Sequence, residues 1–133
     1  MSDITVGTEI PALKLAPINR ATLALYAGAS GDHNPIHIDS DFAKKAGMPD
    51  VFAHGMLSMA YLGRMLTDWQ PQAKIRKFSN RFAAITQLQD VITCSGKVVE
   101  LIEQNDETVA RCEIQAIKAT GEQTLVGEAL VAI

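Results

Sequence analysis

Three side chains that can handle protons or hold water lie close together in one short segment. Asp32, Asn34 and His37 fall within six residues. Pro35 prevents a helix from continuing through the segment and biases Asn34 towards an extended backbone. Gly, Asp, Asn and Pro also form ordinary surface turns, but an imidazole between Ile36 and Ile38 is in a partly apolar setting, where it needs a partner or a chemical role. An acid and an imidazole on one loop could exchange protons with a bound molecule near neutral pH.

The elements around this segment can be predicted from spacing and caps. Asn19 is a suitable N-cap for a short helix that ends near Gly31, and a second short helix is expected from residue 39 or 40 to Gly47, with Phe42 and Ala43 facing inward. Apolar residues surround most of the circumference from 54 to about 68, which predicts a buried helix. The strands are expected at residues 9–15, 75–85, 91–103, 108–119 and 125–133. Helices followed by hairpins are typical of an α+β fold, here one antiparallel sheet wrapped around the buried helix.

Composition limits the class of protein. A chain of 133 residues, 47% of them hydrophobic, fits one globular domain, residues 1–133. The net charge of −3 without a basic run argues against nucleic-acid binding. Only two cysteines, Cys94 and Cys112, and a start without an apolar leader favour a reducing, cytoplasmic location. No apolar run is long enough to predict a membrane span.

The motif resembles a known enzyme family. Residues 26–39, which read YAGASGDHNPIHID, together with the later AHGM at 53–56, closely resemble the hydratase motif of the MaoC-like (R)-specific enoyl-thioester hydratases and 3-hydroxyacyl-thioester dehydratases. The resemblance covers nearly the whole chain. It implies a single hot-dog domain, a dimer whose two sheets join edge to edge, acyl-CoA or acyl-carrier-protein substrates, and no cofactor.

The resemblance also implies roles for individual residues. Asp32 and His37 would form the catalytic pair, jointly holding the water, with Asp32 able to exchange a proton with the α carbon; which of the two is the formal base stays open. Gly55 would donate its backbone N–H to the thioester oxygen, where a helix N-terminus stabilises negative charge. Asn34 would brace the loop, His54 would line the pocket or serve as a cap or core residue, and His33 would be exposed.

One position departs from the pattern of some relatives. These have a Ser near the catalytic acid where this chain has Gly63. The nearest hydroxyls on the predicted helix belong to Ser58 and Tyr61. Either another group or water therefore orients Asp32, or activity is reduced.

Three alternatives compete with a homodimeric hydratase. A metal site built from Asp32, His33, His37 and Asp39 lacks helical spacing and further ligands, so no metal is expected. A hot-dog thioesterase usually has an acid on the central helix, where this chain offers only Asp68, at the far end. A heterodimer would leave this chain as the catalytic member, since it contains the motif.

The substrate cannot be identified from the sequence. The one dense basic group could meet an acyl carrier protein or the phosphates of coenzyme A, or be a solvated strand face. Its members are Lys74, Arg76, Lys77 and Arg81. Acyl length would depend on side chains at the end of a tunnel, with Met59, Leu62 and Met65 as candidates.

Overall fold

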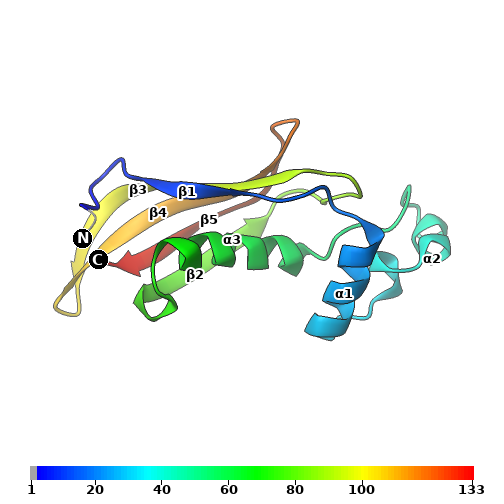
Figure 1. Ribbon diagram of the computed structural model, residues 1–133, viewed down its shortest axis with the longest axis horizontal. Coiled ribbons are helices and arrows are strands. Elements are labelled where there is room, and N and C mark those ends of the chain that lie inside the picture. The colour runs from blue at the N-terminus through cyan, green and yellow to red at the C-terminus, as the bar shows by residue number, and fades with distance from the viewer. Residues whose placement is uncertain (1–2) are drawn as a thin grey trace.

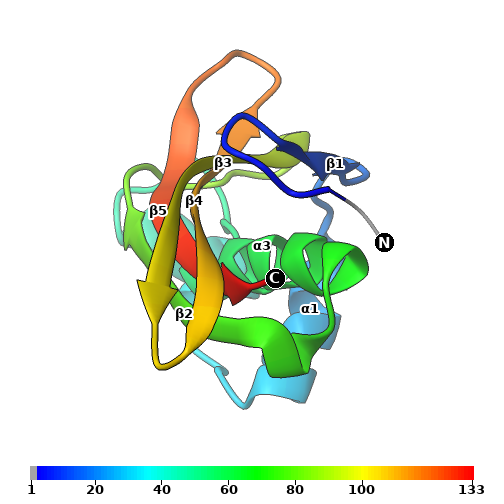
Figure 2. The same cartoon turned by 90° about the vertical axis from the view of Figure 1, so that its left-hand side faces the viewer.

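A curved antiparallel sheet holds one long helix against its inner face in the computed structural model, which describes residues 3–133 (Figures 1 and 2). Two shorter helices lie beyond one end of the sheet, near the start of the long helix (Figure 1). The elements are β1 (Glu9–Lys14), α1 (Arg20–Ser30), α2 (Ser40–Lys45), α3 (Gly55–Trp69), β2 (Ile75–Phe82), β3 (Ile92–Gln104), β4 (Glu107–Lys118) and β5 (Gln123–Ala132), with single 3₁₀ turns at Pro35–His37 and Gln72–Lys74.

The sheet has the strand order β1-β3-β4-β5-β2, and every pair of neighbours is antiparallel. The turn between β3 and β4 is tight because Asn105 and Asp106 both adopt positive φ, 51° and 62°, which matches the twist of a hairpin. β2 is an edge strand and pairs only with β5 among the described residues. In the chain it follows α3 after the short 3₁₀ turn at Gln72–Lys74.

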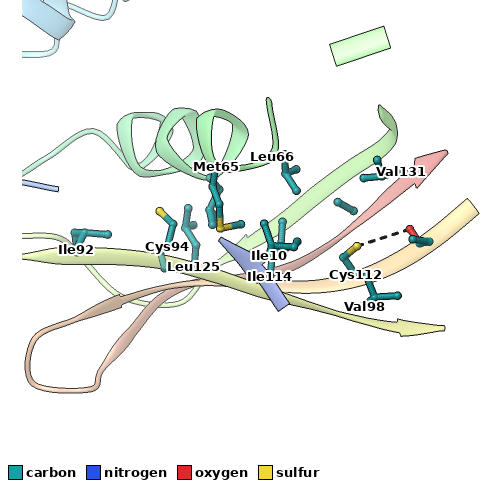
Figure 3. Packing of buried hydrophobic residues seen from close by; sticks show 14 residues of the cluster. Ile10, Met65, Leu66, Ile92, Cys94, Val98, Cys112, Ile114, Leu125 and Val131 are labelled. Carbon is teal, nitrogen blue, oxygen red and sulfur yellow. Dashed lines mark hydrogen bonds between the residues drawn. The ribbon is translucent and has the colours of Figure 1, made fainter. Parts of the chain in front are cut away.

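The main core lies between α3 and the sheet (Figure 3). Leu62, Met65 and Leu66 are at most 1% exposed and belong to one core cluster with residues of the strands. Fully burying such side chains stabilises the fold by about 1.5–3 kcal/mol each. The two cysteines belong to this core, and burial raises the pKa of Cys94 to about 12 and that of Cys112 to about 11. Both therefore remain unreactive thiols at neutral pH.

A second, smaller core joins α1 and α2 to the start of α3, with Leu23 and Ala43 completely buried. The Asn19 side chain accepts from the N–H of Thr22 at 2.8 Å, which confirms the predicted N-cap. Asp50 ties the two helices together, because its carboxylate accepts from Ser40 Oγ at 2.7 Å and also pairs with Arg20. This core fixes the chain immediately before residues 51–55.

The structure corrects several details of the sequence predictions. Phe42 is not inward but 45% exposed, because Ala43 alone faces the small core. The long helix is not buried all round, since Met56 is 54% exposed on its solvent side. β2 ends at Phe82, three residues earlier than predicted. The segment around His37 contains a short 3₁₀ turn in which Pro35 occupies the first position, where its missing N–H costs nothing.

None of the helices formed by residues 3–133 combines the length and the apolar character needed to cross a membrane.

Candidate active site

His37 is held in one orientation by the backbone. Its side chain is 9% exposed, and Nδ1 lies 2.8 Å from the carbonyl oxygen of Phe52. Because a carbonyl oxygen can only accept, Nδ1 carries the proton in this contact and Nε2 keeps its lone pair. The Phe52 carbonyl is itself fixed, since Ala53 N–H donates to the carbonyl of Thr86 at 2.8 Å and Phe52 forms a β-bridge with Gln87. His37 therefore presents Nε2 as a proton acceptor from a rigid position.

Asp32 begins the loop at the point where α1 stops. Gly31 ends α1 with φ of 78°, a left-handed conformation that turns the chain. The Asp32 side chain is exposed, and its Oδ1 accepts from the N–H of Asn34 at 3.2 Å. Asn34 Oδ1 in turn accepts from the N–H of Ile36 at 3.1 Å, and this bond braces the loop. A backbone group thus orients Asp32, while Ser58 lies 3.4 Å from Thr86 instead.

His54 connects the two catalytic candidates. It is 1% exposed, and its Nε2 lies 3.2 Å from the main-chain oxygen of Asp32, to which it donates. Its ring stacks on that of His37 at a centroid distance of 4.0 Å and makes a T-shaped contact with the ring of Tyr26 at 4.9 Å. Burial, and after it the neighbouring His37, lowers the pKa of His54. His54 is therefore neutral at neutral pH and supports the pair without competing for protons.

Asp32, His37 and His54 each offer a possible ligand atom, and these atoms lie within 4.8 Å of one another. Zinc in a structural or catalytic site needs lone pairs that converge on one point. The two imidazole rings are instead nearly parallel, with an angle of 27° between their planes. His33 is exposed and does not join this group. This arrangement suits an acid–base cluster better than a metal centre.

Gly55 lies at the N-terminus of α3, immediately after His54. No side chain caps this end of the helix, and its first turn contains no acidic residue. The first N–H groups of a helix have no partner within the helix, so the N–H of Gly55 can bind an oxygen atom. A Cβ at Gly55 would lie 2.8 Å from the ring of Phe82, which packs directly over the glycine. A cavity of about 330 Å³ begins here, between α3 and the segment that follows β2.

The family model described as "MaoC like domain" matches residues 3–120. The chain belongs to the MaoC-like domain family. A curated MaoC-type relative, the (R)-specific enoyl-CoA hydratase of Rhodospirillum rubrum, is 28% identical over 118 residues, covering 87% of this chain and 80% of the relative. Some other relatives are far larger: the chain is 32% identical over 111 residues to the fatty acid synthase beta subunit TOXC of Cochliobolus carbonum, covering 80% of this chain but only 5% of the relative.

Solved structures agree with the family. An (R)-hydratase from A. caviae superposes with a TM-score of 0.85 at 25% identity, covering 98% of both chains. The ChsH1–ChsH2 complex of Mycobacterium tuberculosis gives a TM-score of 0.82 at 22% identity, covering 97% of this chain and 98% of that one. The predicted family and the predicted hot-dog fold are both confirmed.

The structure brings together all five residues predicted for the site, Asp32, Asn34, His37, His54 and Gly55, at one end of α3. No pattern in the sequence predicts that His54 stacks on His37. Ser58 was identified from the sequence only as a hydroxyl on the predicted helix. The sequence did not predict that three buried hydroxyl residues line the cavity: Ser58, Thr86 and Thr124. These come from a helix, a loop and a strand, and no local pattern relates them.

His54→Phe should lower kcat about fivefold with little change in KM, because the ring is retained but the donor to the Asp32 carbonyl is lost, and one hydrogen bond contributes about 1 kcal/mol. His54→Gln, whose amide nitrogen can take the place of Nε2, should recover part of that loss. Steady-state hydration kinetics on both variants test this. Equal kcat values for the two variants would contradict a positioning role.

The lowered pKa of His54 also predicts a change in stability with pH. In the unfolded chain the residue takes up a proton near pH 6.5, its ordinary pKa, whereas the folded protein resists protonation. The stability that His54 contributes is therefore complete above about pH 6.5 and is lost as the pH falls towards the lower, folded-state pKa. Urea unfolding at pH 7.5 and 5.5 should show a smaller acid loss for His54→Phe than for the wild type.

Proposed function

We propose that this MaoC-family protein is a hydro-lyase that reversibly adds water to trans-2-enoyl thioesters to give (3R)-3-hydroxyacyl thioesters, or catalyses the reverse dehydration, in fatty-acid or polyketide-type metabolism. The observation that carries the proposal is the meeting of Asp32 and His37 beside the uncapped N-terminus of α3 at Gly55. The family match and the similarity to an (R)-specific enoyl-CoA hydratase support it.

The geometry assigns a task to each group. A thioester oxygen bound to the N–H of Gly55 would accept the negative charge that develops as water adds, at the favourable end of the helix dipole. His37, with Nδ1–H held by the Phe52 carbonyl, has Nε2 free to take a proton from water. Asp32 shares that water and delivers a proton to the α carbon, so water and proton reach neighbouring carbons from one loop.

A thioesterase is the main alternative function, and it would usually need an acidic residue on the central helix α3. Asp68 is the only acid on the helix. It lies at the far end, 62% exposed, and is within 3.8 Å of Arg64. Mixing the protein with crotonyl-CoA while following enoyl absorbance and free thiol separates the two reactions. Loss of absorbance without thiol release supports hydration; thiol release alone would refute it.

We further propose that the protein forms a homodimer through β2. This strand leaves one edge unpaired in the described part of the chain, and exposed strand edges tend to be covered. Three exposed apolar side chains lie at the start of α3, at the end of β2 and in the loop that follows it: Met56, Phe82 and Ile85. Light scattering should give twice the chain mass of 14.4 kDa, and hydrogen exchange should protect amides on both edges of β2. A monomeric mass would contradict the homodimer, and a co-purifying second chain would instead indicate a heterodimer, an arrangement compatible with the solved ChsH1–ChsH2 complex.

Two of the four residues in the predicted basic group form ion pairs. Arg76 binds Glu107 and Lys77 binds Glu128, at 2.6 and 2.7 Å. Arg81 and Lys74 form no such pair within residues 3–133, so these two remain candidates for contact with a phosphate or an acidic carrier. Either acyl-CoA or an acyl carrier protein is compatible with this pattern.

A further inference from the structure

The cavity beside Gly55 has a wall that is chemically unlike the rest of its lining. Most of the lining is apolar, contributed by aromatic, alanine, leucine and isoleucine side chains. Three threonine or serine hydroxyls interrupt it: Ser58 on the first turn of α3, Thr86 in the loop after β2, and Thr124 on β5, which are 3%, 4% and 1% exposed. Buried hydroxyls need partners, because an unpaired one costs stability.

At least one of these three hydroxyl groups has a hydrogen that no acceptor within residues 3–133 takes up. Thr124 Oγ1 donates to the carbonyl of Ala116 at 3.2 Å, so its hydrogen has an acceptor. Ser58 Oγ and Thr86 Oγ1 have only each other, at 3.4 Å, which exceeds the 2.5–3.0 Å typical of hydroxyl pairs. Even if that weak contact uses one hydrogen, the other hydroxyl hydrogen has no acceptor among the described residues.

Two donors 3.4 Å apart are well placed to share one acceptor. An oxygen atom about 2.8 Å from each would accept two bonds of ordinary length. Ser58 is three residues after Gly55, which places it about 4.5 Å further along the helix axis. A group bound there would belong to the same molecule whose thioester oxygen reaches Gly55.

The charge of the acceptor is restricted by the lining. None of the eleven residues that line this cavity has an ionisable side chain. A carboxylate or phosphate would therefore be buried without a counter-charge, which is costly. The acceptor must be a neutral oxygen such as a ketone, hydroxyl, ether or amide carbonyl.

We propose that Ser58 and Thr86 form a binding site for a neutral oxygen acceptor of the acyl thioester, and so select substrates that carry one at this distance from the thioester. This inference rests on the proposed hydratase function. Two parts of the substrate could supply the oxygen: an oxygenated acyl chain, or an amide of the pantetheine arm. A volume of about 330 Å³ is in the range of small-molecule sites and could accommodate either.

The test compares two matched substrates, 5-oxo-trans-2-hexenoyl-CoA and 5-methyl-trans-2-hexenoyl-CoA, which differ by an oxygen in place of a methyl group. The variants are Ser58→Ala and Thr86→Val, which remove one hydroxyl each. Thr67→Ala is the control, since Thr67 is an exposed hydroxyl residue near the far end of the same helix. Crotonyl-CoA hydration by the wild type is measured first, because its absence would reject the proposed function rather than this site.

If the acyl chain supplies the oxygen, the wild type should favour the 5-oxo substrate about tenfold in kcat/KM, and each variant should remove most of that preference. If the pantetheine arm supplies it, both variants should lose kcat/KM by the same factor of about five to ten on both substrates. Thr67→Ala should behave as the wild type in either case. Unchanged kcat/KM for both variants on both substrates, with crotonyl-CoA still hydrated, would overturn the proposal.

Discussion

Asp32→Asn and His37→Asn should each lower the rate of enoyl-thioester hydration by about a hundredfold to ten-thousandfold, the usual contribution of a general acid or base. Both substitutions keep the local structure. An Asn at 32 still offers a side-chain oxygen to the N–H of Asn34, and an Asn at 37 can donate to the Phe52 carbonyl from the position of Nδ1. What is lost is the carboxylate in one case and the Nε2 lone pair in the other. Loss of crotonyl-CoA absorbance under steady-state conditions gives the measurement.

Two matched controls lie in the same region of the chain. His33→Asn removes an exposed imidazole four residues before His37, and Asp41→Asn removes an exposed carboxylate on α2. Both should retain hydration within about twofold, as expected for surface substitutions outside the site. If Asp32 and His37 act on the same water, as proposed, the double variant should be little slower than the poorer single variant. A His37→Asn variant as active as His33→Asn would remove the basis for the proposed mechanism.

The candidate catalytic loop was predictable because its structure is local. The Gly31 turn and the braces at Asp32 and Asn34 involve residues no more than four positions apart. The strands were predictable for a similar reason: in β4 every second residue from Ala110 to Ala116 is buried, and that alternation is visible in the sequence. Errors at the strand ends are small, because hairpin turns fix them to within a few residues.

Contacts between distant segments were not predictable. His54 reaches Asp32 across 22 residues, and Ser58 reaches Thr86 across 28. A histidine at a helix start has equally good roles as a cap, a core residue or a pocket wall, and only the fold decides that it stacks on His37. The inward orientation predicted for Phe42 was wrong for the same reason. The helical spacing of α2 does not reveal that Ala43 packs into the small core while Phe42 stays exposed. Side-chain chemistry and local geometry can be inferred from sequence, whereas pairing across the fold requires the structure.

Gly127→Ala should be the most damaging single-methyl change in the sheet. A Cβ at this position would lie 2.1 Å from the carbonyl oxygen of Ser79 and 2.2 Å from Oδ1 of Asn80, both on the neighbouring strand β2. The carbonyl belongs to the backbone of a paired strand and cannot rotate away as a side chain can. We expect a loss of about 3 kcal/mol or more in the free energy of unfolding, at or beyond the upper end for overpacked sites. That is a large part of the 5–15 kcal/mol typical of a domain.

Gly28→Ala is the matched control, because Gly28 lies within α1, is exposed, and has no atom within 4 Å of a Cβ built on it. It should stabilise the protein by about 0.5–1 kcal/mol, as alanine is a better helix former than glycine. Urea unfolding of both variants gives the comparison. Asn80→Ala tests the cause: it removes the side-chain clash but not the carbonyl, so it should fail to rescue Gly127→Ala. Rescue by Asn80→Ala would instead mean that Gly127 is required to make room for the buried amide of Asn80, and that β2 can move away from β5 by enough to admit a methyl group.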